Sequence, residues 1–82
     1  MMDVNVVLFA RARELAGSDS ICLSLDDEAT VADLKTQLLR QYPALGELLP
    51  HCTLAVDHVY SDDGTRLHDG CEIGCIPPVS GG

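Results

Sequence analysis

With 82 residues, the chain is long enough for one small domain, and its 13 acidic residues against 5 basic ones give a formal net charge of −8. A domain of this size buries only roughly 60–65% of the surface that its unfolded chain exposes, which leaves little room for an enclosed active site. The negative charge disfavours binding to nucleic acid and to anionic membrane surfaces, so we expect neither as a partner.

Two strands are predicted near the N-terminus. Residues 4–9 (VNVVLF) form a short, apolar and β-branched run, which is typical of a strand in the middle of a sheet. A short helical turn is expected next and ends near Gly17. The segment Ser20–Leu25 alternates between polar and apolar residues, which indicates a half-exposed strand that pairs with the first in a hairpin.

The main helix is predicted to follow Thr30, a favourable N-cap residue with Asp33 three positions later. Acidic residues at positions 26–28 precede the positive end of the helix dipole and stabilise it. Pro43 ends the helix, because the residue before a proline is disfavoured in the α conformation. Apolar side chains recur at helical spacing, at Val31, Leu34, Leu38 and Tyr42.

The second half of the chain is predicted to add three strands. After a loop or brief helical turn at residues 44–52, one strand lies at Thr53–Val56 and a short one runs through Val59 and Tyr60. Turns are expected at residues 62–64 and 69–70, which consist of Asp and Gly. The last strand covers residues 71–76.

This order of elements predicts an α+β domain in which a mixed sheet carries one main helix on one face. The order favours a β-grasp, whose first and last strands lie side by side in the middle of the sheet, as their apolar sequences require. We expect the β-grasp domain to span residues 1–76 and an extended tail to span residues 77–82. The opposite face of the sheet has no helix to cover it and is available to a partner.

Alternation along the two central strands predicts which side chains lie on this open face. Asn5 and Glu72 are the polar members of the first and last strands, so both are expected to face outward. Phe9 and Ile76 then become apolar side chains on the uncovered face. A contiguous apolar patch marks an interface more often than a small patch that is merely tolerated, so we predict a docking patch there.

Four cysteines and three histidines raise the question of a disulfide, a zinc site or a Cys–His nucleophile. Cys71 and Cys75 are four residues apart in a predicted strand, roughly 13 Å, which is too far for a disulfide. No C-x-x-C turn is present, and no histidine pair accompanies the cysteines, so no metal site is expected. We interpret the cysteines as small buried apolar residues.

The N-terminal segment MMDVNVVLFA has an acidic rather than a basic start, unlike a secretory signal peptide. No apolar run approaches the ~20 residues that a membrane-spanning helix needs. We therefore expect a cytosolic protein that does not enter the membrane.

The C-terminal sequence CEIGCIPPVSGG contributes little to a core but is suited to chemistry at its end. Pro77 and Pro78 fix φ and lack an N–H group, so they stop strand pairing and stiffen the tail. Gly81 and Gly82 have no side chains, so they fit a narrow channel and leave the terminal carboxylate open to attack on a nucleotide phosphate. The alternative is a frayed terminus, although two terminal glycines occur by chance in only roughly one chain in 200.

Four segments of the chain carry a family resemblance: VVLFARARELAG, TVADLKTQL, LAVDHVY and LHDGCEIGCIPPVSGG. Over essentially its whole length the chain resembles the sulfur-carrier small subunit of molybdopterin synthase. The terminal IPPVSGG together with FARAREL is the most specific part. The chain departs from the family at Asp57, where Asn is common, and at Cys71, where Asp is common. Both positions lie at strand ends or turns, so they affect local turn stability rather than the chemistry.

The resemblance implies a ubiquitin-like β-grasp protein that binds no cofactor of its own and is not catalytic alone. An adenylyltransferase similar to ubiquitin-activating enzymes would use ATP to adenylate Gly82, and a persulfide donor protein would convert the adenylate into a thiocarboxylate. The tail (Pro77, Pro78, Val79, Ser80, Gly81 and Gly82) would then enter the pocket of a large subunit and donate sulfur to a cyclic pyranopterin phosphate.

The expected assembly is a heterotetramer of two small and two large subunits. The resemblance adds Tyr60 to the docking patch of Phe9 and Ile76, and Arg13 is a candidate for an ionic contact at its rim. Because ATP and the pterin phosphate are anionic, a chain of charge −8 without a basic cluster is expected to leave both pockets to its partners.

Three alternatives remain open at the level of sequence. The chain could be a sulfur carrier for thiamine or tRNA thiolation, which shares the fold and the terminal glycines. It could be a ubiquitin-like modifier, because an activated Gly82 can also be attacked by a lysine amine. The third alternative is an interaction domain with an inert tail.

Overall fold

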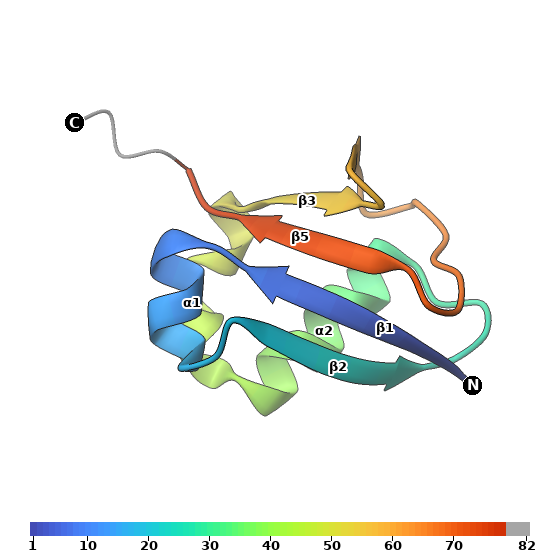
Figure 1. Ribbon diagram of the computed structural model, residues 1–82, viewed down its shortest axis with the longest axis horizontal. Coiled ribbons are helices and arrows are strands. Elements are labelled where there is room, and N and C mark those ends of the chain that lie inside the picture. Colours follow the sequence, from blue (N-terminus) through green and yellow to red (C-terminus); the bar gives the residue numbers. More distant parts are fainter. Residues whose placement is uncertain (79–82) are drawn as a thin grey trace.

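The computed structural model describes residues 1–78. Within this range, five strands form one mixed sheet in the order β2-β1-β5-β3-β4 (Figure 1). The central strands β1 and β5 are parallel, whereas the β1–β2, β3–β5 and β3–β4 pairs are antiparallel. This is the predicted β-grasp arrangement. The strands are β1 (Met2–Leu8), β2 (Ser20–Leu25), β3 (Thr53–Val56), β4 (Val59–Ser61) and β5 (Glu72–Ile76).

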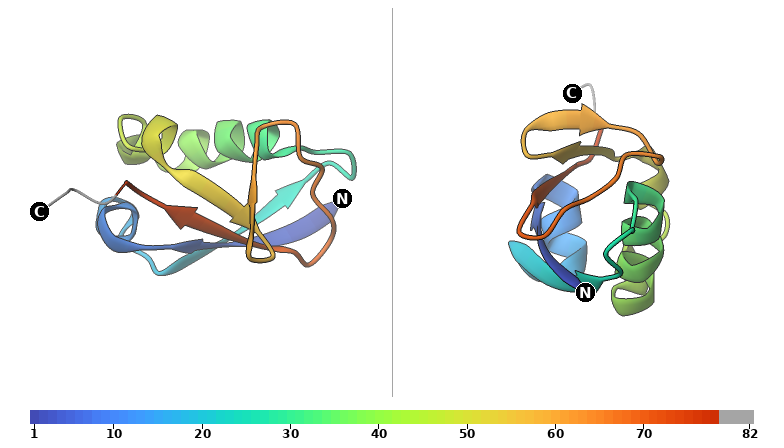
Figure 2. Two further views of the ribbon diagram at one scale, coloured as in Figure 1. Left: turned by 90° about the horizontal axis from the view of Figure 1, so that it is seen from above. Right: turned by 90° about the vertical axis from the view of Figure 1, so that its right-hand side faces the viewer.

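The main helix α2 (Val31–Gln41) lies across one face of the sheet and leaves the other face open (Figure 2). A shorter helix, α1 (Ala10–Ala16), connects β1 to β2 and ends at Gly17, whose φ of 73° suits a left-handed C-cap. The predicted loop after α2 contains two short 3₁₀ helices, η1 (Pro43–Leu45) and η2 (Leu49–His51). The single covered face therefore agrees with the sequence prediction.

Helix α2 begins where the sequence predicts, because its first turn is capped. The backbone N–H of Thr30 donates to the Asp33 carboxylate at 2.9 Å, which completes a capping box. Val31, Leu34 and Leu38 are fully buried against the sheet. At about 25 cal/mol per Å² of apolar surface, this stripe is the main reason that the helix stays on the sheet.

Alternation along β1 and β5 sorts the side chains as predicted. Val4, Val6 and Leu8 of β1 are buried on the helix side, and so are Ile73 and Cys75 of β5. The register pairs the two strands directly and so aligns their faces, with residues 5 to 8 of β1 opposite residues 72 to 75 of β5. One residue of the predicted last strand differs: the strand begins at position 72, and residue 71 belongs to the preceding turn.

The prediction for the cysteines is confirmed at two positions and wrong at one. Cys71 and Cys75 are buried and Cys52 is half-buried, whereas Cys22 is exposed on the open face of β2. The difference follows from the alternation of β2, in which Cys22 occupies a polar position between Ile21 and Leu23. All four thiols are free.

No helix among residues 1–78 is both long and apolar enough to cross a membrane.

Candidate functional site

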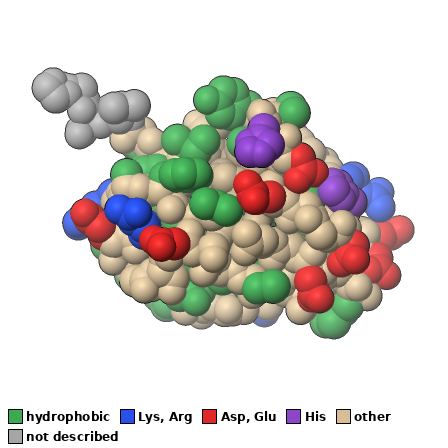
Figure 3. Space-filling model, viewed as in Figure 1, with side chains coloured by type: hydrophobic (Ala, Val, Ile, Leu, Met, Phe, Trp, Pro, Cys, Tyr) green, Lys and Arg blue, Asp and Glu red, His purple; other side chains and the backbone are tan. Residues whose placement is uncertain are grey.

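The open face of the sheet carries a hollow of about 250 Å³ along β5. Hydrophobic side chains gather over this part of the face, with acidic and histidine side chains beside them (Figure 3). We call this feature the open-face hollow. It is lined by Phe9, Ala55, His58, Tyr60, Glu72, Gly74 and Ile76.

Strand register explains why these residues meet. Ala55 of β3 lies opposite Gly74 of β5 on one side and opposite Tyr60 of β4 on the other, so the three share one face. Gly74 and Ala55 are small and form a low floor. A Cβ atom on Gly74 would lie 3.6 Å from Cε2 of Phe9, which shows that the Phe9 ring lies beside this floor as a wall of the hollow.

Phe9 is held in place by the junction between β1 and α1. Its N–H donates to the carbonyl of Cys75 at 3.3 Å, and its own carbonyl accepts the N–H of Ala12 at 3.1 Å. The next residue, Ala10, has a φ of 48°, in the left-handed region that non-glycine residues seldom occupy. The chain therefore turns sharply after β1, and the backbone on both sides of the aromatic ring is fixed.

The structure brings together the three residues predicted for the docking patch. Phe9 is 47% exposed and Tyr60 is 75% exposed, which is high for large apolar side chains, while Ile76 is half-buried. The residues that the sequence prediction missed at this site are Ala55 and His58, whereas the alternation of the last strand also predicted Gly74 on the open face. Their positions depend on the register of β3 and β5, which are distant in sequence.

Arg13 does not line the open-face hollow. It lies on α1, where its Nε is 3.6 Å from an Asp19 carboxylate oxygen, and both side chains are more than half exposed. An exposed pair of this kind contributes only about 0–1 kcal/mol. A rim contact from Arg13 to a partner stays a prediction.

The root of the tail adjoins the hollow. Ile76 is both the last residue of β5 and part of the hollow's lining. Pro77 is buried and Pro78 is exposed, so the chain emerges from the folded body between the two prolines. The other predicted tail residues, Val79, Ser80, Gly81 and Gly82, lie outside the described residues.

A hydrogen-bonded node at one end of the hollow was not predicted from the sequence. Asp57 and His58 form the two-residue turn between β3 and β4, with φ values of 48° and 70°. The Asp57 carboxylate accepts the N–H of Glu72 at 2.9 Å and contacts Nε2 of His68 at 2.6 Å. A two-residue loop between two strands predicts a turn with positive φ, so the turn at Asp57 and His58 could have been predicted from the sequence. The contact with His68 arises only from the fold.

The two side chains of this node shift each other's pKa in opposite directions. The hydrogen bonds from Glu72 and His68 lower the pKa of Asp57. The same contact with Asp57, reinforced by the carbonyl of Asp69, raises the pKa of His68. The charged forms of both groups are therefore favoured in the folded chain.

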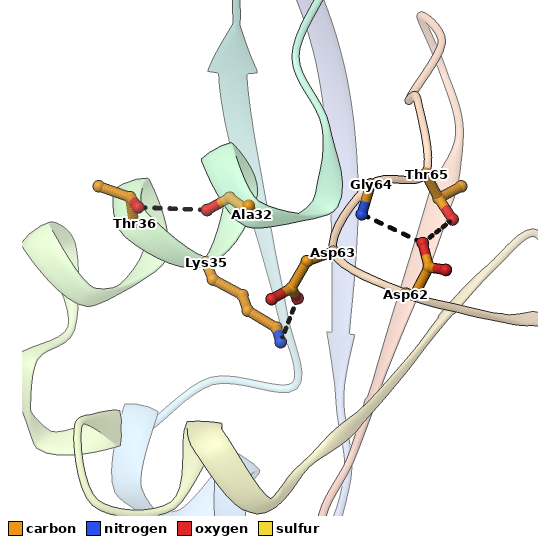
Figure 4. Close-up of polar contacts among 7 residues, drawn as sticks. All are labelled: Ala32, Lys35, Thr36, Asp62, Asp63, Gly64 and Thr65. Carbon is orange, nitrogen blue, oxygen red and sulfur yellow. Dashed lines mark hydrogen bonds and ion pairs between the residues drawn. The ribbon is translucent and has the colours of Figure 1, made fainter.

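On the helix side of the molecule, a second set of polar contacts ties α2 to the loop after β4 (Figure 4). Lys35 of α2 lies 2.6 Å from an Asp63 carboxylate oxygen. The neighbouring Asp62 accepts hydrogen bonds from the Gly64 N–H and the Thr65 hydroxyl, which shape the loop. The N–H groups of residues 31 and 32 donate to carbonyls of the same loop, so these amides of the first helical turn are already paired. We interpret this region as structural.

Other chemistry in the described part of the chain is limited. Within residues 1–78, no three His, Cys, Asp or Glu side chains lie close enough together to hold a metal ion. Burial raises the pKa of Cys75 to about 12, so its thiol is protonated at neutral pH.

The fold and the open face define a ubiquitin-like β-grasp domain. The crystal structure of SAMP1 from Haloferax volcanii is similar with a TM-score of 0.87 and 33% identity, covering 98% of this chain and 99% of that one. One chain of the complex of subunits 1 and 2 of molybdopterin-converting factor from Helicobacter pylori is also similar, with a TM-score of 0.73, 27% identity and coverage of 99% and 100%.

The ThiS family model matches residues 6–82, and the chain therefore belongs to the ThiS family. Among curated relatives, the molybdopterin synthase sulfur carrier subunit of Chlamydomonas reinhardtii is 37% identical, with 99% of this chain and 100% of the relative covered. Small archaeal modifier protein 3 of Haloferax volcanii is 36% identical, with coverage of 99% and 100%. The resemblance found in the sequence is thus confirmed, and a group of modifier proteins shares it.

Proposed function

We propose that this chain is the sulfur-carrier subunit of a molybdopterin synthase. The observation that carries the proposal is the open-face hollow, an exposed apolar site whose lining includes Ile76, the residue from which β5 continues toward the glycine-ended tail. A partner that binds the hollow also receives the tail. The whole-length similarity to a protein named as such a carrier supports this assignment.

The proposed chemistry takes place at the carboxylate of Gly82. A carboxylate oxygen attacks the α-phosphorus of ATP on an activating enzyme, pyrophosphate leaves, and an acyl-adenylate forms. A persulfide sulfur then attacks the acyl carbon, AMP leaves, and reduction of the resulting acyl disulfide by a thiol yields the thiocarboxylate. Adenylation is required because a free carboxylate has no good leaving group.

The proposed acceptor is a cyclic pyranopterin phosphate bound in a large subunit. Phe9, Tyr60 and Ile76 would form the contact with that subunit, and the tail would extend into its pocket. The complex of subunits 1 and 2 in Helicobacter pylori supports a two-subunit assembly. We propose the heterotetramer of two small and two large subunits for this chain as well.

Mass spectrometry of the C-terminal peptide tests the proposed chemistry. After incubation with an activating enzyme, ATP and a persulfide donor, we expect the mass change of one oxygen replaced by sulfur at Gly82. A variant with one alanine added after Gly82 is the matched control, because it keeps the fold and displaces the carboxylate. An unchanged mass in the native chain, under conditions that thiolate a known carrier, would refute the proposal.

A second candidate function is protein modification, which the similarity to small archaeal modifier protein 3 favours. In this case a lysine amine of another protein attacks the activated Gly82 carbonyl, AMP leaves, and an isopeptide bond forms. One reaction that contains the activating enzyme, ATP, the persulfide donor and cell proteins distinguishes the two functions. Peptides that carry a Gly-Gly remnant on lysine indicate modification, whereas a free thiocarboxylate without such peptides indicates the carrier alone.

A further inference from the structure

The node at the end of the open-face hollow joins three segments of the chain, and we call it the Asp57–His68 clamp. Asp57 and Glu72 exchange backbone and side-chain hydrogen bonds: the Asp57 N–H donates to the Glu72 carbonyl at 2.8 Å, and the Glu72 N–H donates to the Asp57 carboxylate at 2.9 Å. The other carboxylate oxygen of Asp57 lies 2.6 Å from Nε2 of His68. The clamp therefore connects the β3–β4 turn to β5 and to the loop that precedes β5.

The two sides of the clamp differ in how firmly they are held. His68 lies on a loop that is pinned to β1, since the Gly70 N–H donates to the Asp3 carbonyl and the Asp3 N–H donates to the Asp69 carboxylate, each at 2.8 Å. On the other side, β4 is a three-residue edge strand that pairs only with β3 in the described sheet. Its partner β3 is itself hydrogen-bonded to the central strand β5, so β4 is the weakly held part of this hairpin. The clamp adds a second attachment to the sheet, at the β3–β4 turn.

The hairpin carries two residues of the open-face hollow. His58 directly follows Asp57, Tyr60 is the middle residue of β4, and both line the hollow, as does Glu72 on the other side of the clamp. We propose that Asp57 and His68 are positioning residues that hold His58 and Tyr60 in the geometry for partner docking, and that this hold weakens when His68 loses its proton.

The geometry at His68 explains why the proton matters. Nε2 faces the Asp57 carboxylate at 2.6 Å and Nδ1 faces the carbonyl of Asp69 at 3.2 Å, and both are acceptors. A neutral imidazole has only one N–H group and can satisfy only one of them, whereas the imidazolium satisfies both. Loss of the proton therefore breaks one of the two contacts that hold His68.

The surrounding charges also favour the protonated form of His68 and the ionised form of Asp57. The carboxylates of Asp57 and Asp69 both raise the pKa of His68, and His58 on the hairpin adds to the lowering of the pKa of Asp57. From β5, the Glu72 N–H donates to the Asp57 carboxylate. From β1, the Asp3 N–H donates to the carboxylate of Asp69, the residue next to His68. The contribution of His68 to folding stability is fully present below its ordinary pKa of 6.5 and is lost as the pH rises through its raised pKa. The contribution of Asp57 to folding stability is fully present above its ordinary pKa of 3.8 and is lost as the pH falls through its lowered pKa.

The free chain provides the first test, which does not depend on the proposed function. In a pH titration followed by NMR, we expect the backbone amide shifts of Glu72 and Tyr60 to follow the titration of the His68 ring. His68→Gln should abolish this response, and His51→Gln, at an exposed histidine on η2, should leave it intact. If the Tyr60 amide does not respond to His68, or responds equally in His68→Gln, the positioning role is refuted.

The second test rests on the proposed function and uses a purified large molybdopterin synthase subunit as the partner. Because the contact between Asp57 and His68 is exposed to solvent and therefore weak, we expect affinity to fall only about two- to fivefold between about pH 6 and pH 8.5. His68→Gln should bind at the weaker level throughout, and Asp57→Gly should do the same, since glycine tolerates the positive φ and removes only the carboxylate. An equal pH dependence in the native chain and in His68→Gln would overturn the inference. Failure to bind at every pH, with the NMR response intact, would count against the proposed function and leave the clamp supported.

Discussion

Phe9 is the single side chain on which the proposed docking depends most. Its ring is 47% exposed and lies beside the small floor of Gly74, so its truncation removes an aromatic wall of the hollow without opening the core. We expect Phe9→Ala to weaken binding to the large subunit by ~2 kcal/mol, as loss of an aromatic anchor commonly does, and to change thermal stability little. Calorimetric binding and thermal unfolding measure the two effects. Val59→Ala, at an exposed apolar residue outside the hollow, is the matched control and should bind normally.

Gly74 allows the opposite change, in which the hollow is filled. A Cβ atom there would be 3.6 Å from the Phe9 ring and 4.0 Å from the Ala55 Cβ, both ordinary contacts, so the strand should accept a β-branched residue. We expect Gly74→Val to fold normally and to lose about 1 kcal/mol or more of binding, because its methyl groups occupy the floor. Normal affinity of the folded variant would show that no partner enters the hollow.

At the scale of elements, the sheet separates stability on one face from docking on the other. The capping box lies at the start of α2, the helix that covers one face of the sheet (Figure 2), whereas the hollow is on the other face. We expect Thr30→Ala to cost about 1 kcal/mol of folding free energy and to lower the melting temperature by about 4–8 °C, with binding of the folded protein unchanged. Thermal unfolding and binding at a temperature well below the transition measure both quantities. A loss of affinity in the folded variant would mean that the two faces are coupled.

The same elements show how far sequence reasoning reaches. Local patterns predicted the face of β1 from Asn5 and the start of α2 from Thr30, because alternation and capping act over a few neighbouring residues. They also predicted that Phe9 and Ile76 share the open face. The contact of Asp57 with His68 was not predictable in this way, since it depends on how β3, β5 and the loop before β5 come together. Local rules do not determine such long-range register, although they constrain it through the buried face.

At the scale of the whole molecule, the charge and the size of the chain bear on the proposed carrier function. Its net charge of −8 disfavours binding of anionic substrates, and a domain of this size can enclose little. The hollow on its open face has a volume of about 250 Å³ and is mostly apolar in its lining. These features fit the proposed function, in which catalytic groups on a partner would stabilise the charge that develops as sulfur leaves the terminus.

Formation of molybdopterin from the cyclic pyranopterin phosphate is the measurement that tests this central claim most directly. Purified thiocarboxylated chain is mixed with the precursor, with and without the large subunit, and product is followed over time. We expect rapid formation with the large subunit and almost none without it, because the proposed function places the cations that bind the substrate phosphate on the partner. Product formed by the chain alone at a rate close to that of the complex would contradict the account.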